Sequence, residues 1–268
     1  MRIGTQEFHT KEKTYIMGIL NVTPDSFSDG GKYQSMDSAL FKAEEMIRDG
    51  ATILDIGGES TRPGYIPVSE AEEMERVLPV VEAIKKRFEI AVSVDTYKSS
   101  VAESAILAGA DLINDIWGLK ADSKMAEVIA KHQVACCLMH NRENTEYVNF
   151  LEDVQKDLRE SLLLAKKAGI STENIILDPG VGFAKNYEQN LEVIRNLGKI
   201  KELGYPVLLG TSRKSVIGLT LDLPSEERVE GTLVTTVAAV AQGAAFVRVH
   251  DIKENARAIQ MAEAIYRR

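Results

Sequence analysis

Cysteine, tryptophan and clustered basic residues are scarce in this sequence of 268 residues. The two cysteines, Cys136 and Cys137, are adjacent within an apolar run. Because neighbouring side chains on a strand point to opposite faces, we expect two buried free thiols and no disulfide. Since the N-terminus also shows no signal peptide, the sequence predicts a protein of the reducing cytoplasm.

Long apolar runs and metal-binding spacings are also missing. No run approaches the roughly 18 apolar residues of a membrane-spanning helix, so we expect no association with a membrane. Neither Cys-x-x-Cys nor His-x-x-x-His occurs, so no metal site of that type is predicted. The formal net charge is −8 and no stretch is rich in Lys and Arg. Nucleic acid is therefore not an expected partner, and an anionic substrate would have to meet local positive charge.

The sequence does contain a repeated pattern of short apolar runs that end in polar residues. The run 175–177, for example, ends at Asp178, and Pro179 and Gly180 then stop a strand. The pattern occurs eight times, and it alternates with stretches whose apolar residues have helical spacing. The predicted strands are 15–20, 52–56, 91–94, 112–113, 134–138, 175–177, 207–209 and 246–249. The predicted helices are 36–49, 69–88 with a capping box at Ser69 and Glu72, 98–108, 123–131, 151–168, 189–203, 228–242 and 252–266, after a hairpin or arm at 1–13.

Strict alternation of strands and helices predicts parallel strands joined by helical crossovers, and eight such strands close a barrel. The sequence therefore predicts an α/β fold, a single (β/α)8 TIM barrel over residues 1–268. A doubly wound open sheet is the alternative, but no Gly-x-Gly-x-x-Gly follows the first strand. In a barrel the carboxyl ends of the strands meet at one mouth, and the long loops 21–35 and 57–68 could close over it.

The polar strand ends fall into a group of acceptors and a group of cations. The acceptors are Asp95, Asn114 and Asp178, and the cationic group comprises Lys214, Arg248 and His250, with Asn21 beside the last strand. A carboxylate can accept two parallel N–H bonds from an aminopyrimidine edge, and an amide can bind a mixed edge. The mouth is thus predicted to bind a nitrogen heterocycle that also bears a phosphate or pyrophosphate.

Some of these strand-end residues also have a plainer interpretation. Asp55 and Asp115 could simply tie loops to strand ends, and His140 and Asn141 could cap loops. Lys214 could instead be a Schiff-base nucleophile, as in barrel aldolases, although its Thr-Ser-Arg-Lys-Ser turn is more typical of a site for anions.

Several long motifs, in this order along the chain, resemble those of the dihydropteroate synthases. They are NVTPDSFSDGG at 21–31, DIGGESTRPG at 55–64, SVDT at 93–96, IND at 113–115, LDPGVGF at 177–183, GTSRK at 210–214 and RVH at 248–250. The resemblance covers nearly the whole chain apart from the N-terminal arm and the helices. No motif position departs from the pattern of the family.

The resemblance implies a cytoplasmic transferase of folate biosynthesis that uses Mg²⁺. Such an enzyme joins 6-hydroxymethyl-7,8-dihydropterin pyrophosphate to 4-aminobenzoate, giving 7,8-dihydropteroate and pyrophosphate. Pyrophosphate would leave first, and the amine would then attack the cation left on the dihydropterin. The resemblance also implies inhibition by sulfonamides, which mimic aminobenzoate, and a homodimer, for which the apolar face of 233–241 could serve.

The resemblance further implies roles for individual residues. Catalysis would involve Asp95, Lys214 and Arg248. The pterin would be bound by Asp95, Asn114, Met139, Asp178, Phe183, Lys214 and Arg248, and the pyrophosphate by Asn21, Arg248 and His250. The aminobenzoate would be bound by Phe27, Thr61, Arg62, Pro63 and Ser215, with Ser215 near a helix N-terminus. Magnesium would be bound by Asn21 and Asp29.

Two other functions fit part of this pattern. A pterin-binding methyltransferase would share Asp95, Asn114 and Asp178, but it would not need a pyrophosphate pocket. A non-catalytic paralogue that binds pterin would be expected to have lost a loop or an anion-site residue, and none is missing here.

Overall fold

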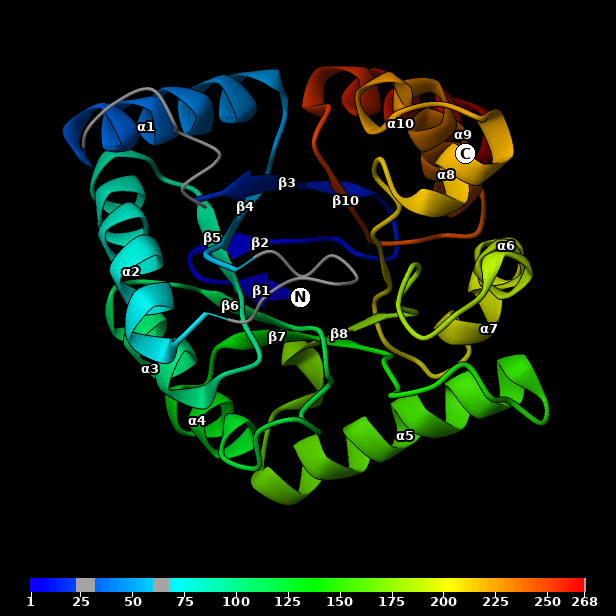
Figure 1. The fold of residues 1–268 in the computed structure, drawn as a ribbon, viewed down its shortest axis with the longest axis horizontal. Helices are drawn as coiled ribbons and strands as arrows, with labels where there is room; N and C mark the ends of the chain where they lie inside the picture. Colours follow the sequence, from blue (N-terminus) through cyan, green and yellow to red (C-terminus); the bar gives the residue numbers. More distant parts are fainter. Residues whose placement is uncertain (23–31, 60–67, 268) are drawn as a thin grey trace.

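The computed structural model describes residues 1–22, 32–59 and 68–267. Within these residues, parallel strands form an eight-stranded sheet in the order β8-β7-β6-β5-β4-β3-β10-β9. The two ends of the sheet meet through a parallel bridge between Leu177 and Val207, where the Leu177 N–H donates to Pro206 O at 2.9 Å. The helices surround this ring of strands (Figure 1). The predicted (β/α)8 barrel is confirmed, and the open doubly wound sheet is excluded because its two edges touch.

The strand and helix bounds follow the predicted alternation closely. The barrel strands are β3 (Tyr15–Asn21), β4 (Ile53–Gly57), β5 (Ala91–Asp95), β6 (Leu112–Asp115), β7 (Ala135–Met139), β8 (Ile175–Asp178), β9 (Leu208–Leu209) and β10 (Phe246–Val249). The helices are α1 (Lys32–Asp49), α2 (Glu70–Arg87), α3 (Ser99–Leu107), α4 (Met125–His132), α5 (Phe150–Ala168), α6 (Tyr187–Arg195), α7 (Leu197–Lys201), α8 (Ser215–Leu221), α9 (Val229–Ala241) and α10 (Ile252–Tyr266), with short 3₁₀ turns η2 (Thr172–Asn174) and η3 (Ser225–Glu227).

Two helical predictions differ from the structure. The single helix predicted over 189–203 is two helices, because Asn196, at φ −114° and ψ 31°, leaves the helical region between α6 and α7. Helix α8 was not predicted as a helix, since its sequence, SVIGLTL, is rich in β-branched residues and contains Gly218. Its formation depends on tertiary packing, through the buried side chains of Val216 and Ile217. The predicted cap at Ser69 is confirmed, because Ser69 Oγ accepts the Glu72 N–H at 3.2 Å.

Side chains alternate along each strand between the helices and the barrel interior. The residues at the amino ends of the strands that face inward are apolar, and they form one cluster with the N-terminal hairpin of β1 (Arg2–Ile3) and β2 (Gln6–Glu7). Phe8, just after β2, packs against Phe246 of β10 with ring centroids 5.6 Å apart. The hairpin lies across the ring of strands (Figure 1), so it forms a floor that fills one end of the barrel.

The two cysteines agree with the sequence prediction of buried free thiols. Cys136 and Cys137 lie on β7, and both are buried and free. Among the described residues, no helix combines the length and the hydropathy that crossing a membrane requires.

Candidate active site

The carboxyl end of the barrel interior gathers the polar residues that the sequence singled out. Asp95 ends β5 and is the register partner of Asn114 on β6. Asp178 ends β8 and is the register partner of Met139 at the end of β7. All four side chains are buried. Arg248, on β10, completes the set, so residues predicted from separate stretches of sequence lie at one end of the same interior.

Arg248 links two carboxylates in the centre of this end of the barrel. Its Nε donates to Asp55 Oδ2 at 2.6 Å, and its Nη2 donates to Asp95 Oδ2 at 2.7 Å. Burial alone would lower the pKa of Arg248, but the charges of Asp55 and Asp95 raise it above its ordinary value. The guanidinium is therefore a permanent cation, 17% exposed, whose remaining N–H groups can meet an anion.

Asp55 was interpreted from the sequence as a residue that could simply tie a loop to a strand, and this interpretation is wrong. Its side chain is fully buried, and its Oδ2 accepts from Arg248 and also from Asn114 Nδ2 at 3.4 Å. Its inward position follows from the alternation of β4, in which Ile53 and Asp55 face one side while Leu54 and Ile56 face the helices. Asp55 thus contacts two of the predicted substrate-binding residues.

Two carboxylate oxygens in this cluster can accept further hydrogen bonds. Asp55 Oδ1 and Asp95 Oδ1 are buried and have no hydrogen-bond partner among the described residues. Burial raises the pKa of Asp95 to about 7, although the charge of Arg248 opposes the rise. A buried acceptor without a donor is costly, so a ligand with N–H groups would be favoured here.

Asp178 and Lys214 carry opposite charges that influence each other in the same end of the barrel. Asp178 Oδ1 accepts the Gly180 N–H at 2.7 Å, and burial raises the pKa of Asp178 while Lys214 opposes the rise. Lys214 Nζ donates to Val181 O at 2.6 Å and lies 5.0 Å from the ring centroid of Phe183. Burial lowers the pKa of Lys214 to about 8, and the charge of Asp178 opposes the fall. These contacts favour an ammonium that binds ligand acceptors over a free Schiff-base amine.

The predicted anion site lies at the ends of the neighbouring strands β3 and β10. Asn21 ends β3, which pairs in parallel with β10, and His250 follows β10 directly. The backbone N–H of His250 donates to Ser212 Oγ at 3.2 Å, and Ser212 Oγ lies 2.9 Å from His250 Nδ1. Because the hydroxyl already accepts from the backbone, it can donate to Nδ1.

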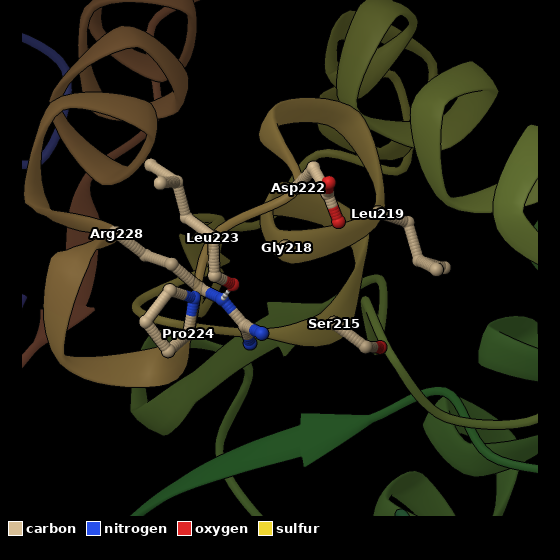
Figure 2. A pocket seen from close by; sticks show the side chains of 7 residues that line it. All are labelled: Ser215, Gly218, Leu219, Asp222, Leu223, Pro224 and Arg228. Atoms are coloured by element: carbon tan, nitrogen blue, oxygen red, sulfur yellow. Dashed lines mark hydrogen bonds between the residues drawn. The ribbon is translucent and has the colours of Figure 1, made fainter.

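Ser215 lies on an open pocket of about 380 Å³ (Figure 2). It is exposed and begins α8, directly after Lys214. Arg228 lies on the same pocket, and a Cβ atom at Gly218 would come within 2.2 Å of its Nη2. Glycine at this position therefore lets Arg228 pack against α8, where its Nη1 donates to Arg213 O at 2.9 Å.

A buried ion network joins the two residues that flank 60–67. Glu59 Oε2 accepts the Val68 N–H at 2.9 Å and also pairs with Lys98 Nζ at 2.6 Å. Lys98 Nζ in turn donates to Val68 O at 2.8 Å and pairs with Glu73 Oε2 at 2.6 Å. This network was not predicted, because its members are separated along the chain and Glu73 looks like an ordinary helix residue in the sequence.

Five predicted site residues lie outside the described part of the chain, and their roles stay predictions. They are Phe27, Asp29, Thr61, Arg62 and Pro63. Among the described residues, no group of three or more His, Cys, Asp and Glu side chains could hold a metal ion. Asn21, the other residue predicted to bind magnesium, is exposed at the end of β3.

Asp115 and His140 differ from Asp55 in their surroundings. Asp115 faces away from the barrel interior and accepts the N–H groups of Trp117 at 2.8 Å and Leu119 at 2.6 Å, so the prediction that it ties a loop is confirmed. His140 does not cap a loop. Its ring is fully buried between Asp157 and Lys185, and that prediction is wrong.

Comparison with known proteins agrees with this geometry. A family model described as pterin binding enzyme matches residues 17–250. A dihydropteroate synthase from Clostridium beijerinckii is 63% identical over 269 residues, covering 100% of both chains. A crystal structure of the Clostridium difficile dihydropteroate synthase in the presence of pteroic acid is 49% identical, with a TM-score of 0.96, and covers 98% of this chain and 100% of that one. The Yersinia pestis dihydropteroate synthase in a sulfonamide drug complex is 41% identical, with a TM-score of 0.92, and covers 99% of this chain and 98% of that one.

Proposed function

This chain belongs to the pterin-binding enzymes, among the dihydropteroate synthases, and we propose how its residues carry out that reaction. The substrates are 6-hydroxymethyl-7,8-dihydropterin pyrophosphate and 4-aminobenzoate, and the products are 7,8-dihydropteroate and pyrophosphate. The observation that carries the assignment of roles is the cation of Arg248 between buried carboxylates at the carboxyl end of the barrel. The pterin, a heterocycle rich in N–H donors, and its anionic pyrophosphate would thus bind side by side.

The acceptor side of the site binds the pterin ring. Asp95 and Asp178 accept N–H groups from the aminopyrimidine edge, and Asn114 supplies both a donor and an acceptor. Lys214 donates to a ring acceptor from its position beside Asp178, and Met139 and Phe183 pack against the ring. The free acceptor atom of Asp95 and the burial of Met139, at 3% exposed, support this assignment.

The cationic side binds the pyrophosphate. Arg248 stacks on the pterin and directs its remaining N–H groups to the leaving group, while His250 and the amide of Asn21 contact the same anion. Support for this arrangement comes from the pairing of β3 with β10, which brings the strand ends that carry these residues together. Magnesium prefers oxygen ligands and retains several waters, so Asn21 with Asp29 and the pyrophosphate would suffice to hold it and neutralise phosphate charge.

The reaction proceeds by loss of pyrophosphate and then attack by the amine. The C–O bond breaks with its electron pair going to pyrophosphate, and the positive charge left on the exocyclic carbon is delocalised into the dihydropterin. Arg248, His250 and Asn21 stabilise the charge on the departing oxygen. The amine lone pair of 4-aminobenzoate then forms the C–N bond, and the nitrogen loses a proton. Because an aromatic amine is neutral at pH 7, it needs positioning more than a strong base.

We infer that the aminobenzoate binds at Ser215, and Phe27, Thr61, Arg62 and Pro63 stay its other predicted contacts. Ser215 is exposed at the first residue of α8 and can donate to the carboxylate. Sulfonamides would occupy the same place, a proposal supported by the sulfonamide complex of the similar Yersinia pestis structure.

The compartment and the assembly of the protein are also inferred. Two buried free thiols suit the cytoplasm, where disulfides are rare. A homodimer could form over α9 and the neighbouring α8, since Val234 is 70% exposed and Leu219 is 69% exposed. Sedimentation of the wild type and of a Val234→Asp variant tests this, with a dimer expected for the first and a monomer for the second.

The proposed roles are tested by measuring pyrophosphate release and dihydropteroate formation in parallel, with and without 4-aminobenzoate. Equal amounts of the two products, dependent on aminobenzoate, are expected from the wild type. An Asp178→Asn variant should show a higher KM for the pterin substrate and an unchanged KM for aminobenzoate. Pterin binding without pyrophosphate release would instead support a methyltransferase or a binding protein.

A further inference from the structure

A group of buried charged residues outside the proposed reaction surrounds Lys185, just after the motif that carries Asp178. Lys185 is 9% exposed and His140 is fully buried. Neither residue is assigned to substrate in the proposed site. Both belong to a chain of hydrogen bonds, here called the Lys185 network, that also includes Asp157, Arg142 and Tyr147.

Each N–H group of the Lys185 ammonium has an acceptor among its neighbours. Its Nζ lies 2.8 Å from His140 Nδ1 and donates to Gly180 O and Phe183 O, each at 3.0 Å. Three acceptors match the three N–H groups of an ammonium. Burial lowers the pKa of Lys185 to about 7, while Asp178 and Asp157 oppose the fall and the acceptors favour the charged form.

The neutral ring of His140 connects Lys185 to α5 through hydrogen bonds. Its Nε2 lies 2.9 Å from Asp157 Oδ2 on α5. Burial lowers the pKa of His140 to about 4, so the ring is neutral at pH 7. With Nδ1 accepting from Lys185, the ring proton sits on Nε2 and is donated to Asp157.

The network then returns to the segment from which it started. Arg142 binds Asp157 through Nε and through Nη2, the latter at 3.1 Å from Oδ1. Its guanidinium lies 4.4 Å from the ring centroid of Tyr147, whose hydroxyl donates to Ala184 O at 2.7 Å. The turn between β8 and α6, residues 179–186, is therefore held by hydrogen bonds to the carbonyl oxygens of Gly180, Phe183 and Ala184.

This turn supplies several contacts of the proposed pterin site. Gly180 N–H binds Asp178 Oδ1, and Val181 O accepts from Lys214 Nζ. The ring of Phe183 lies beside the same ammonium. Gly180, Gly182 and Ala184 all have positive φ angles, 71°, 86° and 45°. A positive φ is unfavourable for alanine, so contacts with the rest of the protein must stabilise this backbone conformation at Ala184.

We propose that Lys185 is a positioning residue for pterin binding, which ties the carbonyls of Gly180 and Phe183 to His140 and so sets the place of Asp178 and Lys214. This role rests on the proposed pterin contacts of Asp178 and Lys214. It requires no contact between Lys185 and the substrate. Loss of the ammonium would remove the hydrogen bonds that hold the turn and would displace the side chains that bind the pterin. The residues that bind the aminobenzoate would not be affected.

The test compares Lys185→Met with Val81→Ala, a cavity variant in α2 whose side chain is fully buried away from the turn. Both variants should lower the melting temperature. Lys185→Met should also raise the KM for the pterin pyrophosphate about 10-fold or more, because small displacements of binding groups are costly. The KM for 4-aminobenzoate should stay within about twofold, and Val81→Ala should change neither KM.

A second variant, His140→Gln, covers the case in which Lys185→Met does not fold. It keeps a donor for Asp157 and removes the Nδ1 acceptor, so the pterin KM should rise by a smaller factor. A pterin KM that changes no more than in Val81→Ala, while Asp178→Asn raises it, would overturn the role of Lys185 alone. If Asp178→Asn also leaves the pterin KM unchanged, the proposed pterin site fails and this inference fails with it.

Discussion

The two ends of the barrel interior are built from the same strands and have opposite chemistry. On β10 the inward-facing residues change from Phe246 to Arg248, and on β4 they change from Ile53 to Asp55. The floor is an apolar cluster closed by the N-terminal hairpin, whereas the mouth holds buried charges and two carboxylate oxygens that have no hydrogen-bond partner among the described residues. A step of two residues along one strand thus leads from a side chain that packs in the apolar core to a side chain of the proposed active site.

The comparison teaches where stability and function are located. Packing at the floor removes apolar surface from water and stabilises the fold without reference to a ligand. Burying charges at the mouth is costly unless each one is paired. Without substrate, the polar atoms of the mouth are therefore expected to lack some hydrogen-bond partners, whereas the apolar floor needs none. Substitutions at the floor should mainly affect stability, and substitutions at the mouth should also affect catalysis and substrate binding.

The largest expected effect is that of Arg248→Ala. This substitution leaves Asp55 and Asp95 without their cation, which should cost about 3–5 kcal/mol of unfolding free energy. It should also lower kcat by about 100- to 1000-fold, since a group that stabilises the leaving group is lost. Urea unfolding and steady-state kinetics measure the two effects.

Arg267→Ala is the matched control at the floor end. Its side chain is 16% exposed, compared with 17% for Arg248, and its Nη2 donates to Thr14 Oγ1 and Ala244 O, both at 2.9 Å. Stability should fall while kcat per folded molecule stays unchanged. Wild-type turnover in Arg248→Ala would contradict the assigned role of the guanidinium.

Phe8→Ala should destabilise the protein by a comparable amount without affecting catalysis. The Phe8 side chain is 2% exposed and contacts Tyr15 and Phe246. Its removal leaves a cavity in the floor and should cost about 3–5 kcal/mol. Denaturant unfolding measures the loss. Below the unfolding transition both KM values should match the wild type, and a raised pterin KM would show that floor and mouth are coupled.

Asp55→Asn and Asp115→Asn compare two buried aspartates at strand ends. Asp55→Asn weakens a charged hydrogen bond to Arg248, so kcat/KM for the pterin substrate should fall about 10- to 100-fold. Asp115→Asn loses an acceptor for the Trp117 or Leu119 N–H, which should cost about 1–3 kcal/mol of stability and leave the pterin KM unchanged. Equal kinetic effects of the two variants would refute the distinction between them.

A further expected effect is a pH dependence that differs in sign for folding and for binding. The pKa of Asp95 is about 7 in the folded protein because of burial, and a free Asp titrates near about 3.9. The folded state therefore binds this proton more tightly, and the contribution of Asp95 to stability should fall as pH rises from about 4 to 7. Pterin binding needs the ionised carboxylate, so affinity should instead fall about tenfold for each pH unit below 7.

Melting temperatures and binding of a pterin without the pyrophosphate, measured from pH 5 to pH 8, separate these two trends. The pyrophosphate is omitted because it titrates in the same range. In Asp95→Asn both trends should be reduced. A binding curve in this variant with the wild-type pH dependence would show that another group is responsible.

Much of the fold could be predicted because strand and helix periods are local. Apolar runs of a few residues, each ending in a polar residue, alternate with helical spacing, and eight repeats are sufficient for a barrel. The exceptions are segments whose local preference is weak, such as α8, which forms through the packing of Val216 and Ile217.

The sequence by itself determined the alternation of strands and helices and the chemical types at the mouth. Only the tertiary structure decided which strand-end residues face inward. Asp55 and Asp115 follow similar apolar runs, yet one side chain binds Arg248 inside the barrel and the other binds the backbone of its own loop. The reason is that side chains alternate along a strand, so one position of difference in register exchanges the interior for the exterior. Likewise, Lys185, His140 and Asp157 are far apart in the chain, and the packing of α5 against the barrel brings them together.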